Sequence, residues 1–176
     1  MIPAIPSNSV LSLMAQGEGS GFDPANDPIG FRSALGSFVT GVTLVTTQTP
    51  SGPVGIIANS FASVSLDPPL VLWSPAKKSA RFADFASAQQ FTIHVLGAAQ
   101  RDLCAAVIAS KHAVRDLPST GAVDATVAHF ECTLSASHDA GDHVIVVGRV
   151  IRAHHHGGTP LVFANGVYGQ FNPVAG

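Results

Sequence analysis

The stretch that most constrains the fold is Gly55–Pro69, which reads G-I-I-A-N-S-F-A-S-V-S-L-D-P-P. Its second half alternates apolar and hydroxyl side chains, a pattern typical of a strand that is buried on one face. Val64 and Leu66 are therefore expected to face a core. Pro68 and Pro69 end this strand, because proline donates no ladder hydrogen bond and holds the preceding residue extended.

The same stretch has the composition of a ligand site. Short polar side chains stand beside glycine and alanine, so a ligand could approach the backbone closely there. Asn59, Ser60, Ser63 and Ser65 supply the amide and hydroxyl groups. A serine-rich strand and turn at the surface would have the same composition, so these residues alone leave both interpretations open.

Length and composition indicate a single domain with an unusually small share of charged residues. The 176 residues match the usual size of one domain, and 46% of them are hydrophobic. Only 11% are charged, which is low for a free monomer. So few charges predict a large buried or self-associating surface.

Charge, apolar runs and cysteines exclude several classes of protein. A net charge of −2 gives no general affinity for nucleic acid or for anionic membranes. No run reaches the roughly 18 apolar residues that a membrane span needs. Cys104 and Cys132 form neither a CxxC motif nor a disulfide framework, which favours a reducing, cytoplasmic location.

Residues 1–28 differ from the rest of the chain in being rich in Ser, Gly, Pro and Asn. No basic segment precedes an apolar run, so they are not predicted to be a secretory signal. Gly17–Gly21 has a linker composition, and no strand or helix flanks it as a phosphate-binding fingerprint requires. The sequence therefore predicts a flexible N-terminal arm over residues 1–28 and one domain over residues 29–172.

Beyond the arm, many short strands separated by turn signals accompany few helices. Asp27 and Pro28 open a helix that is expected to end at Gly41, and further helices are expected within residues 74–88 and 100–110. Strands are predicted over residues 42–47, 54–58, 70–73, 91–96, 122–127, 129–137, 144–153, 160–163 and 168–171. This order predicts a mainly β protein, an antiparallel β-barrel with peripheral helices, rather than a parallel α/β sheet.

A basic cluster precedes the second predicted helix, formed by Lys77, Lys78, Ser79 and Arg81. Free backbone N–H groups and the helix dipole favour an anion at such a position. Three cations and a hydroxyl would therefore suit a phosphate. A solvated basic surface is the alternative interpretation of this cluster.

Histidines form two further candidate groups. His143 directly follows the turn residues 139–142, D-A-G-D, which would hold its side chain at the rim of a barrel. His154, His155 and His156 are consecutive and follow a predicted strand. Because successive side chains of a strand point to opposite faces, at most two of these three can converge.

Together these motifs resemble the signature of the short-chain flavin reductase family, the reductase components of two-component flavin monooxygenases. Seven motifs stand in the order typical of the family and span most of the chain. They are an Arg32-led helix, F-V-T-G-V at residues 38–42, the stretch at residues 55–69, Ser79, V-L-G-A-A-Q at residues 95–100, G-D-H at residues 141–143 and P-L-V-F-A-N-G-V-Y at residues 160–168.

The resemblance implies a split β-barrel with Greek-key connections, the FMN-binding fold of this family. It also implies a homodimer in which the flavin lies near the subunit boundary. The implied activity is that of an NAD(P)H-dependent flavin reductase, an oxidoreductase that passes a hydride from NADH or NADPH to FMN or FAD. The implied partner is a flavin-dependent monooxygenase that takes the reduced flavin.

The resemblance also implies roles for individual residues. Hydride transfer itself needs no acid or base, so no catalytic residue is assigned, and no metal ligand is assigned. His143 is expected to bind NAD(P)H, and Ser79 to meet the flavin phosphate. The residues expected to bind the flavin are Thr40, Ala58, Asn59, Ser60, Ser63, Ser65, Lys77, Ser79 and Tyr168.

One residue departs from the family pattern, and two other functions stay open. The family usually has Asn where His94 stands. This ring could belong to a core histidine with satisfied hydrogen bonds, or it could touch the edge of the flavin. The chain could also be a non-catalytic flavin-binding protein or electron carrier, or a metal-binding barrel that uses residues 154–156.

Overall fold

The structure, a computed structural model, describes residues 21–110 and 126–174 of the chain. Backbone contacts divide the chain into two units, residues 1–35 and 36–176. Most of the arm predicted over residues 1–28, and most of the strand predicted over residues 122–127, lie outside the described residues. The predicted boundary at residue 28 therefore stays a prediction.

Helix α2 (Pro28–Gly36) begins where the sequence predicts. The Asp27 carboxylate accepts a hydrogen bond from the Gly30 backbone N–H at 2.8 Å, which caps the first turn. The helix ends at Gly36 instead of the predicted Gly41, because residues 40–41 form strand β1 (Thr40–Gly41). The start of this helix is thus encoded locally, whereas its end depends on strand pairing.

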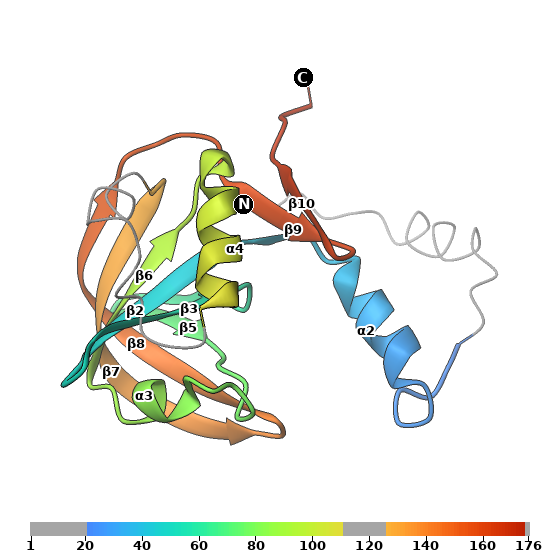
Figure 1. The fold of residues 1–176 in the computed structure, drawn as a ribbon, viewed down its shortest axis with the longest axis horizontal. Coiled ribbons are helices and arrows are strands. Elements are labelled where there is room, and N and C mark those ends of the chain that lie inside the picture. Colours follow the sequence, from blue (N-terminus) through green and yellow to red (C-terminus); the bar gives the residue numbers. More distant parts are fainter. Residues whose placement is uncertain (1–20, 111–125, 175–176) are drawn as a thin grey trace. The chain divides into compact units, whose positions relative to one another are not determined.

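Seven antiparallel strands form the larger sheet, in the order β3-β2-β6-β7-β8-β5-β4. They are β2 (Thr43–Thr49), β3 (Gly52–Ala58), β4 (Ala62–Leu66), β5 (Pro69–Trp73), β6 (Gln90–Val95), β7 (Ala128–Ala140) and β8 (His143–His155). The sheet curves into a barrel wall (Figure 1). β3 and β4 are the two edge strands of this sheet, and they are consecutive in the chain. Residues 59–61 therefore connect the two edges of the sheet, which is the opening of a split barrel.

The described residues of this unit also form a smaller sheet and three short helices. β1, β9 (Leu161–Ala164) and β10 (Val167–Gln170) pair antiparallel, and the turn between β9 and β10 holds Asn165 and Gly166 at φ values of 49° and 79°. The helices are α3 (Phe82–Ala86), η1 (Ala98–Gln100) and α4 (Arg101–Ala109), and α4 packs against β3 (Figure 1). No helix in the described part of the chain is long and apolar enough to cross a lipid bilayer.

Two clusters of buried side chains form the core among the described residues. In the first, the Trp73 ring meets Phe85 edge-on at 5.2 Å and Phe91 at 6.1 Å between ring centroids. This cluster joins α3 to the strands of the larger sheet. The second cluster ties α4 to β2 and β9, and its buried members are Val42, Leu44, Leu96, Cys104, Val107 and Leu161. The prediction of a mainly β protein with peripheral helices is therefore confirmed.

The predicted burial of strand β4 is wrong. Val64 is 48% exposed and Leu66 is 95% exposed, whereas Ser65 is half-buried. β4 is an edge strand, and a β-bulge between Ser63 and Ser65 shifts its register against β5. Residues 64–66 still alternate, but the extra residue of the bulge puts Ser65 on the more buried face, so Val64 and Leu66 lie at the surface of the chain.

His94 is a core residue of β6. It is 6% exposed, its Nε2 atom lies 3.0 Å from the Thr46 hydroxyl, and its ring centroid lies 5.8 Å from that of His129. Burial, with a smaller contribution from His129, lowers the pKa of His94 to about 4, so the ring is neutral near pH 7. Its place agrees with the core alternative, although Nδ1 has no hydrogen-bond partner among the described residues.

Candidate functional site

Two of the predicted flavin residues, Ser60 and Ser79, lie on segments that are hydrogen-bonded together. The Ser60 hydroxyl accepts a hydrogen bond from the Ser74 backbone N–H at 2.9 Å and donates to the Ser74 carbonyl oxygen at 3.3 Å. Ser74 opens the loop of residues 74–81 that carries Ser79. The Ser79 hydroxyl in turn accepts the Arg81 backbone N–H at 3.3 Å, which shapes the turn before α3.

The same loop docks on the turn between β7 and β8, which carries His143. The Lys77 backbone N–H donates to the Asp142 carbonyl oxygen at 2.9 Å. The Lys77 ammonium group donates to the Gly141 carbonyl oxygen at 2.6 Å and forms an ion pair with Asp139. These contacts bring the predicted phosphate loop and the predicted nucleotide-binding histidine to one rim of the barrel. The loop of residues 74–81 and the turn of residues 139–143 are called the rim below.

The orientation of His143 is set by its neighbour in the sequence. His143 Nδ1 lies 2.7 Å from Asp142 Oδ1. This hydrogen bond lowers the pKa of the Asp142 carboxyl group, and the charge of the protonated form of His143 adds to the effect. A hydrogen atom on Nδ1 leaves Nε2 as the acceptor of the neutral ring. The His143 side chain is 43% exposed, so its ring is open to a ligand.

The basic cluster of the sequence does not converge on one point. The Arg81 guanidinium donates to the carbonyl oxygens of Val107 and Ser110, and to the Ser110 hydroxyl at 2.9 Å. These groups are at the C-terminal end of α4, where a cation offsets the helix dipole and satisfies free carbonyl groups. Arg81 is therefore a helix cap, while the exposed Lys78 stays beside the rim.

A second group of predicted residues lines a cavity of about 200 Å³. Two predicted flavin residues and three apolar residues form its wall: Val42, Ile57, Asn59, Phe163 and Tyr168. The Tyr168 ring packs against Phe163 with centroids 5.1 Å apart, and burial raises the pKa of its phenol. Asn59 directly precedes Ser60, so the cavity and the rim share the segment between β3 and β4.

The other predicted flavin residues divide into two pairs. The Thr40 hydroxyl donates to the Phe163 carbonyl oxygen at 3.4 Å, and Ala58 ends β3 directly before Asn59, so both adjoin the cavity. Ser63 and Ser65 lie instead on the edge strand β4, and neither lines the cavity.

A larger hollow of about 520 Å³ lies elsewhere on the larger sheet. Its walls come mainly from β2, from β6 and from the segment between α3 and β6, and they contain none of the predicted flavin residues. Many of these wall residues are Thr, Ser or Gln, without the convergent charges of the rim. Size alone therefore does not identify the site, and the chemistry of the rim and of the smaller cavity carries more weight.

The comparisons with known proteins agree with this arrangement. A family model described as "Flavin reductase like domain" matches residues 35–172. The chain belongs to this family. It is 53% identical over 148 residues to the FMN reductase (NADH) SmoA of Agrobacterium fabrum, covering 81% of this chain and 85% of that protein. It is 36% identical over 174 residues to the HsaB reductase subunit of a flavin-dependent monooxygenase from Rhodococcus jostii, covering 89% and 85% respectively.

Solved structures of the family share the fold. The NADH:FAD oxidoreductase SgcE6 of Streptomyces globisporus C-1027 superimposes with a TM-score of 0.78 at 32% identity, covering 89% of this chain and 99% of that one. The same protein in complex with NAD and FAD fragments gives a TM-score of 0.77 at 33% identity, with the same coverage. The family and the split barrel expected from the sequence motifs are therefore confirmed.

Two acidic residues at the rim were predicted only as turn residues. Asp142 orients His143, and Asp139 pairs with Lys77. An acid directly before a histidine is a local signal that could have suggested the first contact. The second contact joins segments that are far apart in the sequence, so only the fold reveals it.

The Arg81→Gln variant is expected to unfold more easily, because the C-terminal end of α4 loses its charged donor. The free energy of unfolding should fall by about 1–3 kcal/mol, the usual cost of leaving such groups unpaired. Urea denaturation followed by circular dichroism measures the change. Lys78→Gln removes a nearby exposed cation and is the control, with an expected change below about 0.5 kcal/mol. Equal effects of the two substitutions would show that Arg81 acts only as a surface charge.

Proposed function

We propose that this chain is an NAD(P)H-dependent flavin reductase that passes a hydride from NADH or NADPH to FMN or FAD. The observation that carries the proposal is the family match over residues 35–172, combined with the rim that gathers predicted flavin and nucleotide residues. The names of the relatives, an FMN reductase (NADH) and an NADH:FAD oxidoreductase, support the reaction class.

The donor set of the site suits a flavin nucleotide. The cavity is mainly apolar and has the exposed Asn59 amide at its wall, which fits a flat ring with one polar edge. The Ser79 hydroxyl and the exposed Lys78 lie on the adjoining loop and fit a phosphate. Lys77 would have to share its ammonium group between a phosphate and its present partners, Asp139 and Gly141.

The protein contributes placement to this reaction, because the two nucleotides supply the chemistry of hydride transfer. His143 is proposed to bind the nicotinamide through Nε2, in the orientation that Asp142 imposes. Asn59 is proposed to donate to the polar edge of the flavin, where negative charge grows on reduction. Burial raises the pKa of Cys104 to about 11 and that of Cys132 to about 12, so neither thiol is a nucleophile here.

Purified protein is expected to oxidise NADH or NADPH when a flavin is added. Steady-state loss of absorbance at 340 nm, with FMN, FAD and riboflavin tested in turn, measures this activity and its preferences. Protein that neither binds a flavin nor accelerates nucleotide oxidation with any of the three would contradict the proposal.

The Ser79→Ala variant tests whether the flavin phosphate binds at the rim. Loss of the hydroxyl should weaken FMN binding by about 1–2 kcal/mol if it meets a phosphate oxygen. Riboflavin lacks the phosphate, so its affinity should hardly change. Equal losses for FMN and riboflavin would place Ser79 outside the phosphate site.

His143→Ala is expected to impair the use of NAD(P)H without affecting the flavin. Loss of the contact should raise KM for the nucleotide, or lower kcat if the contact forms only in the transition state. The expected effect is about 1–3 kcal/mol in kcat/KM, the range for a lost hydrogen bond to a partly buried group. Stopped-flow reduction and flavin fluorescence titration measure the two steps separately.

His138 offers a matched control for this experiment, because it is an exposed histidine on the same hairpin. His138→Ala should leave both steps unchanged. The opposite result would contradict the proposal. If the His143→Ala enzyme has normal NAD(P)H kinetics and a flavin Kd raised by more than about twofold, His143 contacts the flavin and not the nicotinamide.

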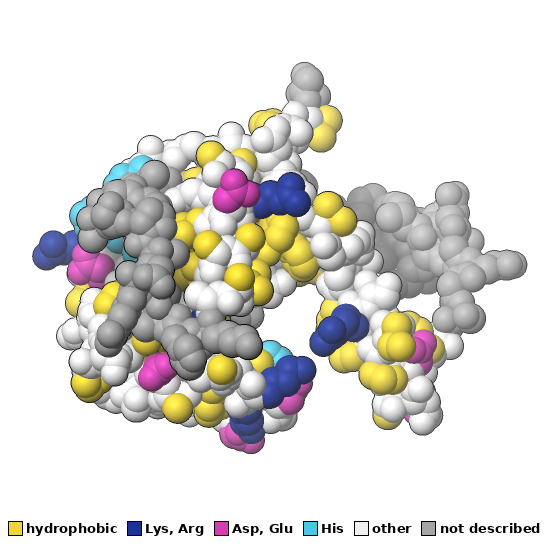
Figure 2. Space-filling view, viewed as in Figure 1, with side chains coloured by type: hydrophobic (Ala, Val, Ile, Leu, Met, Phe, Trp, Pro, Cys, Tyr) yellow, Lys and Arg dark blue, Asp and Glu magenta, His cyan; other side chains and the backbone are white. Residues whose placement is uncertain are grey.

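A homodimer is part of the proposal. The chain has few charges, and Lys, Arg, Asp and Glu cover only scattered spots on the described part of the face in Figure 2. Val64 and Leu66 expose apolar surface on the edge strand β4, which favours a contact between copies.

Sedimentation is expected to give a particle about twice the 18.0 kDa of one chain. Leu66→Glu should shift this particle towards the monomer, because it places a charge in the proposed contact. Ile108→Glu, at an exposed apolar position of α4, is the control. A flavin-loaded wild-type monomer at micromolar concentration would contradict the proposal.

The partner is proposed to be a flavin-dependent monooxygenase that takes the reduced flavin. HsaB of Rhodococcus jostii and a relative from Acinetobacter baylyi are named as the reductase components of such enzymes. A cytoplasmic location is also proposed, since Cys104 and Cys132 are buried as free thiols, which fits a reducing compartment. Cell fractionation, and a coupled assay in which a monooxygenase depends on this protein for its reduced flavin, test the two points.

A further inference from the structure

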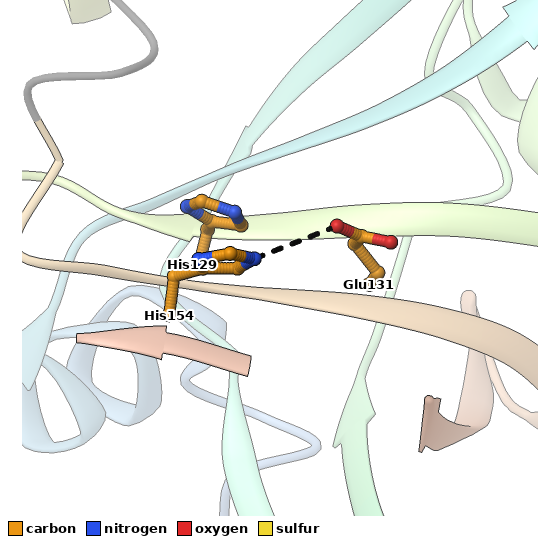
Figure 3. A group of neighbouring side chains, drawn as sticks. All are labelled: His129, Glu131 and His154. Atoms are coloured by element: carbon orange, nitrogen blue, oxygen red, sulfur yellow. Dashed lines mark ion pairs between the residues drawn. The ribbon is translucent and has the colours of Figure 1, made fainter. Parts of the chain in front are cut away.

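A group of histidine and glutamate side chains lies near the end of the β7–β8 hairpin that is remote from its turn. His129 and Glu131 are alternate residues of β7, and His154 of β8 is the cross-strand partner of His129. Alternate residues and direct cross-strand partners share one face of a sheet, so the three side chains project together (Figure 3). Histidine side chains also gather beside acidic and basic ones along one edge of the molecule in Figure 2.

The potential ligand atoms of this cluster are close to one another. The rings of His129 and His154 stack with centroids 4.3 Å apart, and His154 Nε2 lies 3.8 Å from Glu131 Oε1. One nitrogen or oxygen atom from each of the three residues can be chosen so that all lie within 4.8 Å of one another. His156, just beyond β8, places its Nε2 atom 3.4 Å from His129 Nδ1 and adds a fourth imidazole.

Two imidazoles and a carboxylate are a ligand set typical of Zn²⁺ and related divalent metal ions. Ligand atoms at about 2.0–2.2 Å from a tetrahedral zinc ion stand roughly 3.3–3.6 Å apart, so the most widely separated of these atoms would have to approach by up to roughly 1.5 Å. The side chains can do so by rotation, since Glu131 is 38% exposed and His154 is 42% exposed. The backbone register already provides the harder requirement, which is convergence from two strands.

The ion pair between Arg152 and Glu131 leaves this carboxylate available to a cation. Arg152 competes for Glu131, but its Nε atom is 4.0 Å from Oε2 and its side chain is 68% exposed, which makes a weak pair. The opposite oxygen, Oε1, faces His154. The buried His94 packs against His129 with a ring nitrogen, Nδ1, that has no hydrogen-bond partner in the described part of the chain.

We propose that His129, Glu131 and His154 form a binding site for a divalent transition-metal ion of the zinc class, with His156 or water as the fourth ligand. His154 and His143 are eleven residues apart on β8, about 35 Å along an extended strand, so the metal takes no part in the proposed hydride transfer. The ion instead clamps β7 to β8. The site does not rest on the proposed function.

The experiment uses the full chain without a polyhistidine tag, stripped of metal with a chelator and titrated with Zn²⁺ in competition with a chromophoric chelator. One equivalent should bind, and Zn²⁺ should raise Tm by several degrees, because a ligand that binds only the folded state stabilises it. His154→Ala and Glu131→Gln should each weaken binding at least tenfold. The double variant His129→Ala/His154→Ala should lose both the binding and the rise in Tm.

His155→Ala is the matched control, because His155 adjoins two members of the cluster but belongs to the opposite face of β8. It should bind Zn²⁺ as the wild type does. Circular dichroism and Tm in the absence of metal show whether each variant is folded. If His154→Ala unfolds, His154→Gln replaces it, with the same expected loss. Absence of stoichiometric binding, or equal loss in the variants of His154 and His155, would overturn the proposal.

Discussion

The long hairpin of β7 and β8 is the element on which the rest of the barrel depends. Each strand has 13 residues, β7 pairs with β6 on one side, and β8 pairs with β5 on the other. Antiparallel partners fix each other's register, so this hairpin aligns both halves of the larger sheet. Two irregularities in its pairing, near Cys132 and Ala136, let the strands bend as the sheet curls. Its turn presents His143, and its far end presents the histidine and glutamate cluster.

Features that depend on neighbouring residues could be predicted from the sequence. The Asp27 cap, the Asn165–Gly166 turn and the position of His143 after a hairpin turn each follow from a few consecutive residues. The order of strands and helices could be predicted for the same reason, because the two-residue alternation of strands and the residues typical of turns are local signals. The family motifs then supplied what periodicity could not, namely the split barrel and the class of reaction.

Features that depend on contacts between distant segments could not be predicted. Arg81 stands in a basic cluster in the sequence, yet its guanidinium reaches the end of α4 because the fold places those carbonyl groups beside it. The convergence of His129 with His154 requires the register of β7 on β8, which no single segment encodes. The run at residues 154–156 was expected to supply at most two converging rings, and His154 and His156 do lie 6.2 Å apart in nearly parallel planes.

The bulge in β4 has a consequence for how this barrel can meet other chains. β4 forms one boundary of an unclosed sheet, where free backbone groups would ordinarily invite a foreign strand to add in register. The irregularity between Ser63 and Ser65 disrupts the even spacing of those groups. Strand addition is therefore disfavoured at the very edge that exposes Leu66. A partner can therefore pack against the apolar side chains of this edge, whereas its strands do not pair with the β4 backbone. The edge can stay uncovered by a further strand without promoting the growth of fibrils.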